Sequence, residues 1–256
     1  MARFSRVFVI GHSHCGSTLL GRMLDMHPAI ICCGELLWLD DAISSRLPCL
    51  CGRSLEECGF WRLLLNAWPA AARADYRRTG LAELEGLRRG AGRELLLDLS
   101  KSRVWRHPIF RRDPAAGYVF VLRDPRALIA SRLREGGRLR HELVRHAKWQ
   151  ERFAKMIERA GARGLAIRYE ELADNPEKEI RRVCGFLGLD YDPALLKPAQ
   201  REHHFVHSSS SPYLRGSGEI RRDERWRSEL SAGELALIRR RLWNLPGYRG
   251  SYDLSS

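Results

Sequence analysis

The residues best suited to chemistry lie in a short polar loop between Gly11 and Thr18. An apolar run at residues 7–10 precedes this loop, and leucine and methionine recur at helical spacing after it. A strand, a glycine-bounded loop and a helix start place free backbone N–H groups and the positive end of a helix dipole at one point. This arrangement suits a bound phosphate or sulfate. The candidate residues of the anion site are His14, Cys15, Gly16, Ser17 and Thr18.

The same loop argues against nucleoside triphosphate hydrolysis. Gly11 and Gly16 have the spacing of the loop G-x-x-x-x-G-K-[ST], and Thr18 stands in its hydroxyl position. Ser17, however, replaces the lysine that contacts the β- and γ-phosphates. An ATPase or GTPase would therefore lack its main cationic contact. A kinase of a small metabolite and a non-catalytic nucleotide-binding protein are the two alternative functions.

Further polar side chains follow other predicted strands. These strands are expected at residues 29–33, 94–99, 117–122 and 165–169. Glu35 follows the second strand of the chain, Lys101 the third, and Arg123 the fourth. Because the carboxyl ends of parallel strands meet at one edge of a sheet, we expect these side chains to lie near the anion loop.

Strands that alternate with helices predict an α/β fold with a central parallel sheet of about five strands and helices on both faces. A long amphipathic helix is expected at 139–160, with Leu143, Val144 and Phe153 among its core residues. Asn175-Pro176 and the capping box Ser231-x-x-Glu234 mark two further helix starts. We expect one domain over residues 1–256, with a helical insertion or lid at about 40–92.

The composition of the chain limits the classes of partner that we expect it to bind. The chain of 256 residues carries a formal net charge of +13, which attracts anionic ligands. Its arginines are scattered among acidic residues rather than gathered in a basic tail, so we expect no nucleic-acid partner. No apolar run approaches the roughly 20 residues of a membrane span, and the first strand leaves no room for a signal peptide. A cytoplasmic protein without a membrane partner is expected.

Seven cysteines and no export signal predict thiols rather than disulfides. Cys49, Cys51 and Cys58 offer three potential zinc ligands without an obvious fourth, although Cys32 and Cys33 lie upstream. Buried or unpaired thiols, with no metal site, are the preferred interpretation. Histidines 203, 204 and 207 have no complete metal spacing and are expected in a loop on the acceptor side.

Several segments resemble the sulfotransferases that use 3′-phosphoadenosine-5′-phosphosulfate (PAPS). The loop segment IGHSHCGSTLLGRMLDMHP is similar to their 5′-phosphosulfate loop, and VFVLRDPRALIASRL to their 3′-phosphate motif, with Arg123 and Ser131 at the matching positions. The segment YLRGSGEIRRDERWRSEL resembles their C-terminal nucleotide loop, where Arg215 and Gly216 match. The segments IRYEELADNPEKEIRRVCGFLGL and CLCGRSLEECGFW are also similar to members of the family, so the resemblance spans nearly the whole chain.

This resemblance implies a P-loop-like fold and transfer of a sulfuryl group from PAPS to a hydroxyl or amine, with no metal required. Lys101 would stabilise the leaving phosphate. Glu35 would be the base, because DMHPAIICCGE resembles tyrosyl-protein sulfotransferases at their catalytic glutamate. His14 stands where many relatives carry lysine or arginine, so it is either an imidazolium contact or leaves the role to N–H groups and Lys101. The acceptor is expected to be a small molecule, a glycan or a peptide.

Overall fold

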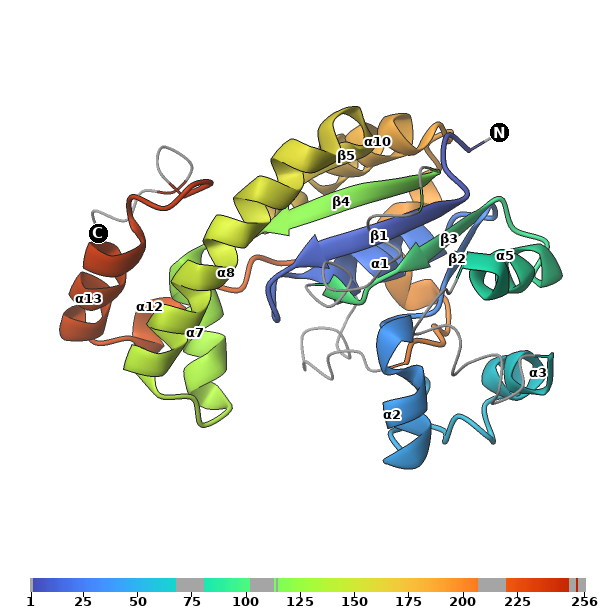
Figure 1. The fold of residues 1–256 in the computed structure, drawn as a ribbon, viewed down its shortest axis with the longest axis horizontal. Helices are drawn as coiled ribbons and strands as arrows, with labels where there is room; N and C mark the ends of the chain where they lie inside the picture. The colour runs from blue at the N-terminus through green and yellow to red at the C-terminus, as the bar shows by residue number, and fades with distance from the viewer. Residues whose placement is uncertain are drawn as a thin grey trace.

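A five-stranded parallel sheet forms the centre of the molecule. The computed structural model describes residues 2–67, 81–101, 113, 115–206, 220–248 and 252, with only the backbone described at 67 and 81–84. The strands lie in the order β2-β3-β1-β4-β5 (Figure 1). Their bounds are β1 Arg6–Gly11, β2 Ile30–Cys32, β3 Leu95–Asp98, β4 Ala116–Leu122 and β5 Gly164–Arg168. The predicted α/β class and parallel sheet are confirmed.

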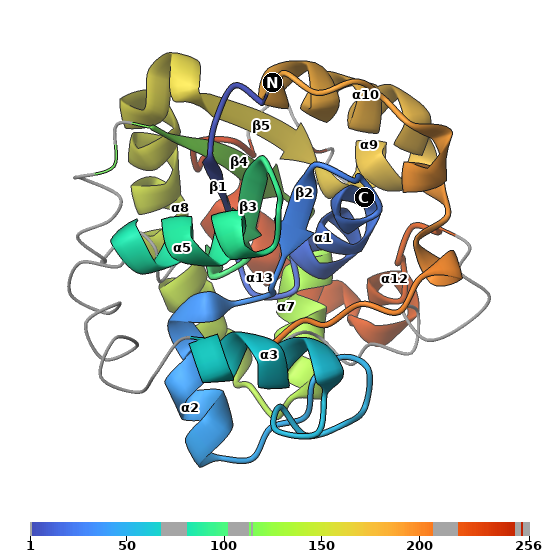
Figure 2. The same ribbon diagram turned by 90° about the vertical axis from the view of Figure 1, so that its right-hand side faces the viewer.

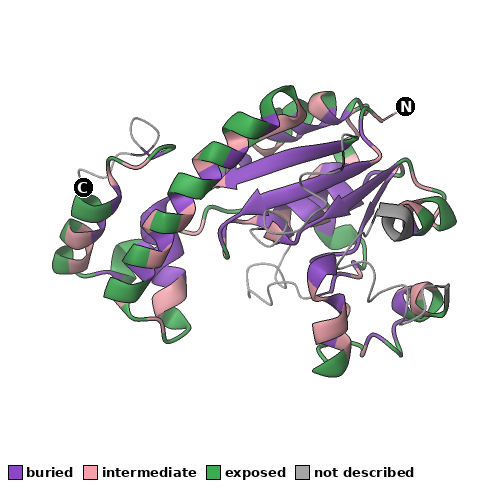
Figure 3. Cartoon of the chain, viewed as in Figure 1, coloured by how far each residue is buried: buried purple, intermediate pink, exposed green. Residues whose placement is uncertain are grey.

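Helices cover both faces of this sheet, because successive side chains of each strand point to opposite faces. Val7 and Val9 of β1 pack with α1 (Ser17–Asp25), α9 (Tyr169–Asp174) and α10 (Pro176–Leu187). Phe8 and Ile10 pack on the opposite face with α8 (Leu139–Ala160). Figure 3 shows that strands β1 to β4 are buried, while α8 exposes its outer face. These two apolar layers fix the strand ends that carry the candidate site.

Local sequence signals set most helix starts. Pro125 opens α7 (Pro125–Arg134), and the Asp124 side chain caps it by accepting a bond from the Arg126 N–H. Ser231 and Glu234 form the predicted capping box at α13 (Ala232–Leu242). Helix α8 has the predicted bounds, but the prediction that Val144 faces the core is wrong, since its exposed fraction is 55%.

The segment between β2 and β3 contains short helices that extend the core on the α8 face. These are η1 (Leu36–Trp38), α2 (Leu39–Ser44), α3 (Gly59–Ala67) and α5 (Leu81–Gly90). Trp61 of α3 is fully buried in the same apolar cluster as Phe8 of β1. Figure 2 shows α2 and α3 together beneath the sheet, beside the segment that leads away from η5 (Pro198–Gln200).

The remaining described elements lie after β4. They are η3 (Gly161–Arg163), η4 (Pro193–Leu196) and α12 (Trp226–Glu229). A third apolar cluster joins α7, α12 and α13 with Tyr248 and Tyr252. Within the described ranges, no helix is both long and apolar enough to cross a membrane.

Candidate functional site

The loop after β1 adopts its shape because two of its glycines have no space for a side chain. A Cβ on Gly11 would lie 2.4 Å from Cys15 Sγ, and one on Gly16 would lie 2.4 Å from Cδ2 of Tyr169. Gly16 also has a φ of 96°, a left-handed conformation that glycine adopts without strain. His14 has a φ of 68°, so it also adopts the left-handed conformation, which costs conformational energy in a residue with a side chain. Such strained residues are found most often at functional sites.

The loop delivers the chain into the N-terminus of α1, where Ser17 and Thr18 are buried. The N-cap residue is Gly16, which has no side chain to cap this terminus, and the first turn contains no acidic residue. The first N–H groups of a helix lack intrahelical acceptors and carry the positive end of the helix dipole. An anion placed here would meet these donors, and no carboxylate of the first turn would compete with it.

Glu35 and Lys101 meet at the same edge, although they follow different strands. Lys101 Nζ donates a hydrogen bond to Glu35 Oε1, and the side chains are 14% and 9% exposed. The backbone N–H of Glu35 donates to the carbonyl of Val206 at 3.0 Å, which fixes the turn that presents the carboxylate. Lys101 has a φ of 55°, a second strained backbone at the site. The predicted base and cation are therefore in direct contact.

His14 lies close to this pair. Burial lowers the pKa of its imidazole; Glu135 opposes that shift, and the charges of Lys101 and Arg132 add to it. His14 Nε2 lies 3.2 Å from Oε1 of Glu135. The lowered pKa favours the neutral ring in the free protein, so any imidazolium contact requires a bound anion to raise that pKa.

Cys15 contributes its backbone rather than its thiol. The side chain is fully buried, and burial raises the pKa of the thiol, an effect that the Lys101 charge partly offsets. The Cys15 N–H donates to the carbonyl of His12 at 3.1 Å, closing the loop. The ring of His12 stacks on His146 with centroids 4.1 Å apart, and burial lowers the pKa of His12 well below its usual range. His12 is therefore a neutral packing residue.

Arg123 is buried beneath the anion loop. Its guanidinium donates to the His14 carbonyl at 2.5 Å and to Asp223 at 3.0 Å, and it lies over the Tyr169 ring at 4.3 Å. Its Nε has no hydrogen-bond partner among the described residues. Ser131 lies on α7, the helix that follows Arg123, and its hydroxyl accepts a hydrogen bond from Arg134 at 2.7 Å. Arg123 thus ties the loop to the segment that contains Asp223.

Tyr169 is a site residue that the sequence motifs did not single out. Its ring fills the space beside Gly16 and lies under Arg123. Its hydroxyl donates to the Arg221 carbonyl at 3.3 Å and accepts from the Asp223 N–H at 3.2 Å. The sequence feature that could have identified Tyr169 is its position directly after β5, at the edge where the other strands end. The two remaining candidates, Arg215 and Gly216, lie outside the described residues.

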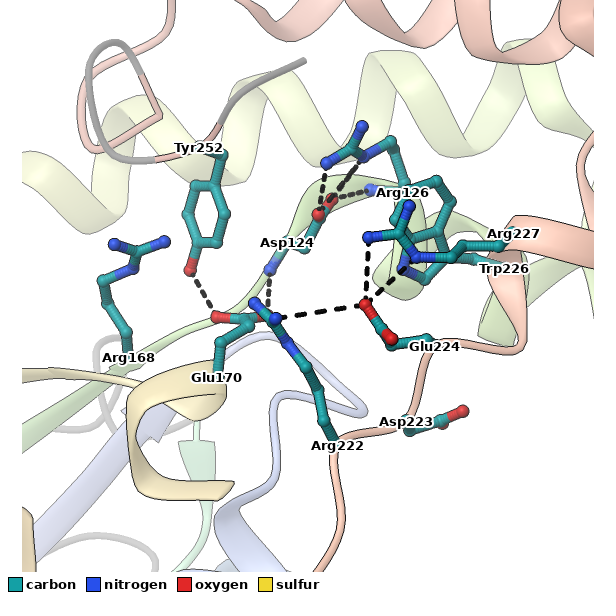
Figure 4. A pocket seen from close by; sticks show the side chains of 10 residues that line it. All are labelled: Asp124, Arg126, Arg168, Glu170, Arg222, Asp223, Glu224, Trp226, Arg227 and Tyr252. Carbon is teal, nitrogen blue, oxygen red and sulfur yellow. Dashed lines mark hydrogen bonds and ion pairs between the residues drawn. The ribbon is translucent and has the colours of Figure 1, made fainter. Parts of the chain in front are cut away.

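A cavity of about 250 Å³ adjoins Arg123 on the side of α7 and the C-terminal segment (Figure 4). Four arginines and four carboxylates line it together with two aromatic rings. The lining residues are Asp124, Arg126, Arg168, Glu170, Arg222, Asp223, Glu224, Trp226, Arg227 and Tyr252. Figure 4 shows bonds from Arg126 to Asp124 and from Tyr252 to Glu170. The four arginines and four carboxylates therefore cancel in formal charge, and Arg168 Nε is a buried donor with no hydrogen-bond partner among the described residues.

The family identity follows from comparison with known proteins. The model of the sulfotransferase family matches residues 6–193, which is most of the chain. The chain therefore belongs to the sulfotransferase family, as the motifs predicted. It is an enzyme that transfers a sulfuryl group.

Individual relatives agree with this assignment. A Caenorhabditis briggsae protein named as a protein-tyrosine sulfotransferase is 24% identical over 212 residues, covering 74% of this chain and 68% of its own. A Caenorhabditis elegans protein of the same name is 26% identical over 102 residues, covering 37% of this chain and 39% of its own.

Solved structures show the same fold. The sulfotransferase domain of a Synechococcus olefin synthase has a TM-score of 0.64 at 24% identity, covering 96% of this chain and 98% of its own. The sulfotransferase domain of the curacin biosynthetic pathway has a TM-score of 0.63 at 23% sequence identity, covering 92% of this chain and 96% of its own. A mouse sulfotransferase complexed with 3′-phosphoadenosine-5′-phosphate (PAP) has a TM-score of 0.53 at 11% sequence identity, covering 96% of this chain and 88% of its own. At these identities, the likeness establishes the sulfotransferase fold.

Proposed function

We propose that this sheet edge binds PAPS and transfers its sulfuryl group to an acceptor hydroxyl or amine, leaving 3′-phosphoadenosine-5′-phosphate (PAP). The observation that carries the proposal is the contact between Glu35 and Lys101 beside the uncapped N-terminus of α1. A base, a cation and anion donors at one point are what sulfuryl transfer needs.

The donor is held at its two anionic ends. The N–H groups at Gly16, Ser17 and Thr18 receive the 5′-phosphosulfate, and Cys15 closes the loop that presents them through its own N–H bond to the His12 carbonyl. Arg123 and Ser131 receive the 3′-phosphate, and Arg215 and Gly216 complete that contact. Support for Arg123 comes from its burial and its one unpartnered donor. Support for Ser131 comes from its place on α7, eight residues further along the chain.

The chemical step forms one bond to sulfur and breaks another. The acceptor oxygen or nitrogen attacks sulfur, while the bond between sulfur and the 5′-phosphate oxygen breaks in line with it. The acceptor proton passes to Glu35, and Lys101 neutralises the charge that develops on the leaving phosphate. His14, once protonated, adds a second positive charge beside the transferring group. No metal is needed for this step.

The acceptor class is proposed from the relatives. Because two of them are named as protein-tyrosine sulfotransferases, a tyrosyl phenol is the first acceptor to test. We place the acceptor on the side of α2 and α3, within a lid of about residues 40–92 that belongs to the same single domain. The cytoplasmic location stays a prediction, to be checked by cell fractionation.

The first experiment is calorimetric titration with PAP, beside ATP and AMP, with and without magnesium. PAP is expected to bind without metal, and AMP, which lacks the 3′-phosphate, at least about tenfold more weakly, since a charge-assisted contact is worth roughly 1.5–3 kcal/mol. Arg123→Ala should remove this preference. Arg152→Ala, an exposed arginine on α8, is the matched control and should leave it unchanged.

Two results would overturn the proposal. Preference for ATP with magnesium would indicate a metabolite kinase. Binding of PAP without sulfation of any hydroxyl or amine acceptor would indicate a nucleotide-binding protein that is not catalytic. Sulfation that Glu35→Gln and Lys101→Ala leave unchanged would exclude both residues from the chemical step.

A further inference from the structure

Three cysteines of the lid meet one histidine from a distant part of the chain. Cys49, Cys51, Cys58 and His204 each present one sulfur or nitrogen atom, and these four atoms all lie within 4.8 Å of one another. His204 follows Cys58 by 146 residues, so this fourth partner is not visible in the local cysteine spacing. Cys49 and Cys58 are buried, while Cys51 and His204 are partly buried.

The distances among three of these atoms, those of Cys49, Cys58 and His204, are close to the edges of a tetrahedron around one small ion. With Zn–S bonds of about 2.3 Å and a Zn–N bond of about 2.0–2.1 Å, two sulfurs lie about 3.8 Å apart and a sulfur and a nitrogen about 3.6 Å apart. Cys49 Sγ and Cys58 Sγ are 3.8 Å apart. Nδ1 of His204 lies 3.3 Å from Cys58 Sγ and 3.9 Å from Cys49 Sγ. A disulfide would need the two sulfurs at about 2.05 Å.

We propose that Cys49, Cys51, Cys58 and His204 bind one structural Zn²⁺ ion. Three thiolates and an imidazole in a closed tetrahedron are a donor set that zinc prefers and that leaves no open coordination position. The site is separate from Glu35 and Lys101, and its existence does not depend on the proposed PAPS chemistry.

The surroundings orient the histidine for this role. Its ring stacks on Phe60 with centroids 5.3 Å apart and an interplanar angle of 10°. Nδ1 faces the thiols, while Nε2 lies 3.6 Å from a carboxylate oxygen of Glu202. A carboxylate behind a ligating histidine fixes the ring and increases its basicity. Trp61 Nε1 also donates to the His204 carbonyl at 3.0 Å. The nitrogen is therefore directed at the sulfurs by several contacts.

The backbone around Cys49 and Cys51 forms a tight turn that brings the two sulfurs together. The N–H of Gly52 donates to the Cys49 carbonyl at 2.8 Å, and the N–H of Cys49 donates to the Arg53 carbonyl at 2.9 Å. Gly52 has a φ of 90°, which a residue with a side chain adopts only with strain. The turn is joined to the histidine segment by a bond from the Leu50 N–H to the Phe205 carbonyl at 3.0 Å.

Charge at the site is also accounted for. Binding of Zn²⁺ to three thiols and one neutral imidazole releases up to three protons and leaves a net charge of −1. Arg53 supplies one nearby cation, which lies 3.3 Å from Glu202 and interacts with Cys51. Its charge offsets the Glu202 carboxylate behind His204, so the metal complex and its outer shell together would carry a charge of −1.

The position of the site gives it a structural task. It joins the lid, through Cys49 and Cys58, to the segment that contains His204 and Val206. Val206 forms a parallel bridge to Gly34, accepts the N–H of Glu35 and donates to the Cys33 carbonyl. A metal at the cluster would therefore anchor the segment that positions the turn before Glu35.

The test is metal analysis of the full chain after expression in zinc-supplemented medium and removal of loosely bound metal. About one zinc per chain is expected, together with the intense visible absorption of tetrahedral cobalt–thiolate when Co²⁺ replaces it. Removal of the zinc by a chelator should lower the thermal midpoint by at least about 5 °C. Less than about a tenth of an equivalent, or a Cys49–Cys58 disulfide in the purified protein, would overturn the proposal.

Variants separate ligation from simple destabilisation. Cys58→Ser and His204→Ala should lose at least about tenfold in zinc affinity, while His204→Cys keeps four ligands and should retain the metal. Cys184→Ser removes a buried thiol of α10 outside the cluster and should hold a full equivalent. Equal zinc affinity of Cys58→Ser and Cys184→Ser, measured by competition with a chelator, would contradict the assignment. If Cys58→Ser does not fold, His204→Ala and His204→Cys are compared instead, and equal zinc affinity of these two variants would likewise overturn the proposal.

Discussion

At the scale of single residues, Glu35 and Lys101 follow different strands and are paired at the edge where those strands end. The sequence predicted both residues for a simple reason: the ends of parallel strands must meet, so polar side chains just beyond them meet as well. The sequence could not predict that the two groups bond directly, because that depends on the left-handed backbone at Lys101 and on the turn held by Val206.

Removing the base should slow the chemical step. Glu35→Gln is expected to lower kcat by about 10²–10⁴-fold, since general base catalysis contributes that range, and to leave PAP affinity within about threefold. Glu151→Gln, on the exposed face of α8, is the matched control. Steady-state kinetics with a phenolic acceptor and calorimetry with PAP measure the two effects. A variant with wild-type kcat would exclude Glu35 as the base.

The lowered pKa of His14 has a consequence for the pH dependence of donor binding. Burial lowers the pKa of His14 in the free protein. An anion beside the ring favours imidazolium, so donor binding should raise the pKa of His14 if the ring contacts the anion. PAP affinity should therefore rise as pH falls through the pKa of the complex, and level off below the pKa of the free protein. His14→Gln should remove this dependence, leaving only that of the PAP phosphates. Calorimetry at a series of pH values tests this; parallel profiles would show that His14 does not contact the anion.

The histidine of the proposed zinc site shows where residue-level prediction fails. Three cysteines close together in the sequence were recognisable as a cluster, but His204 reaches them only through tertiary structure. His203, its neighbour, was expected on the acceptor side. It is instead buried between Asp25 and the Pro198 carbonyl, each at 2.7 Å. Adjacent residues of an extended segment point in opposite directions, which the spacing of polar residues alone does not reveal.

At the scale of elements, the sequence predicted the parallel sheet, the helix starts at Pro125, Pro176 and Ser231, and both ends of α8. These features depend on local chemistry, namely proline, capping side chains and hydrophobic periodicity. The exposure of Val144 does not depend on local chemistry, because it is determined by which parts of the fold pack against each face of α8. Tyr169 was missed for the same reason, since its contacts come from the loop, β4 and the segment around Asp223.

The loop and α1 act as one element, and Gly16 connects them. Gly16→Ala should destabilise the protein by at least about 1–2 kcal/mol, because alanine is strained at this φ and its Cβ would meet Tyr169. It should also weaken PAP binding by displacing the N–H groups of α1.

The matched control is Gly185→Ala within α10, where a Cβ meets nothing within 4 Å. It should stabilise the protein by about 0.5–1 kcal/mol and leave PAP binding unchanged. Urea denaturation and calorimetry on both variants check this. Equal stability of the two variants would contradict the strain assigned to Gly16.

At the scale of the whole molecule, the formal charge of +13 acts on any polyanionic ligand before contact. The association rate constant of PAP should fall severalfold between low salt and about 0.5 M NaCl, because screening shortens the range of the attraction. The dissociation rate should change less. Stopped-flow binding measures both rates, with uncharged adenosine as the control ligand. Equal salt dependence for PAP and adenosine would show that long-range attraction is unimportant.

In the proposed reaction, the ion pair of Glu35 and Lys101 would also set the order in which donor and acceptor bind. While Lys101 donates to the carboxylate, an acceptor that binds first would find Glu35 occupied and no sulfuryl group present. Binding of the donor would give Lys101 a phosphate partner and leave Glu35 able to accept the acceptor proton. Glu35 would therefore not activate water or acceptor in the absence of the donor. Product-inhibition patterns should show that the donor binds first and that PAP dissociates last.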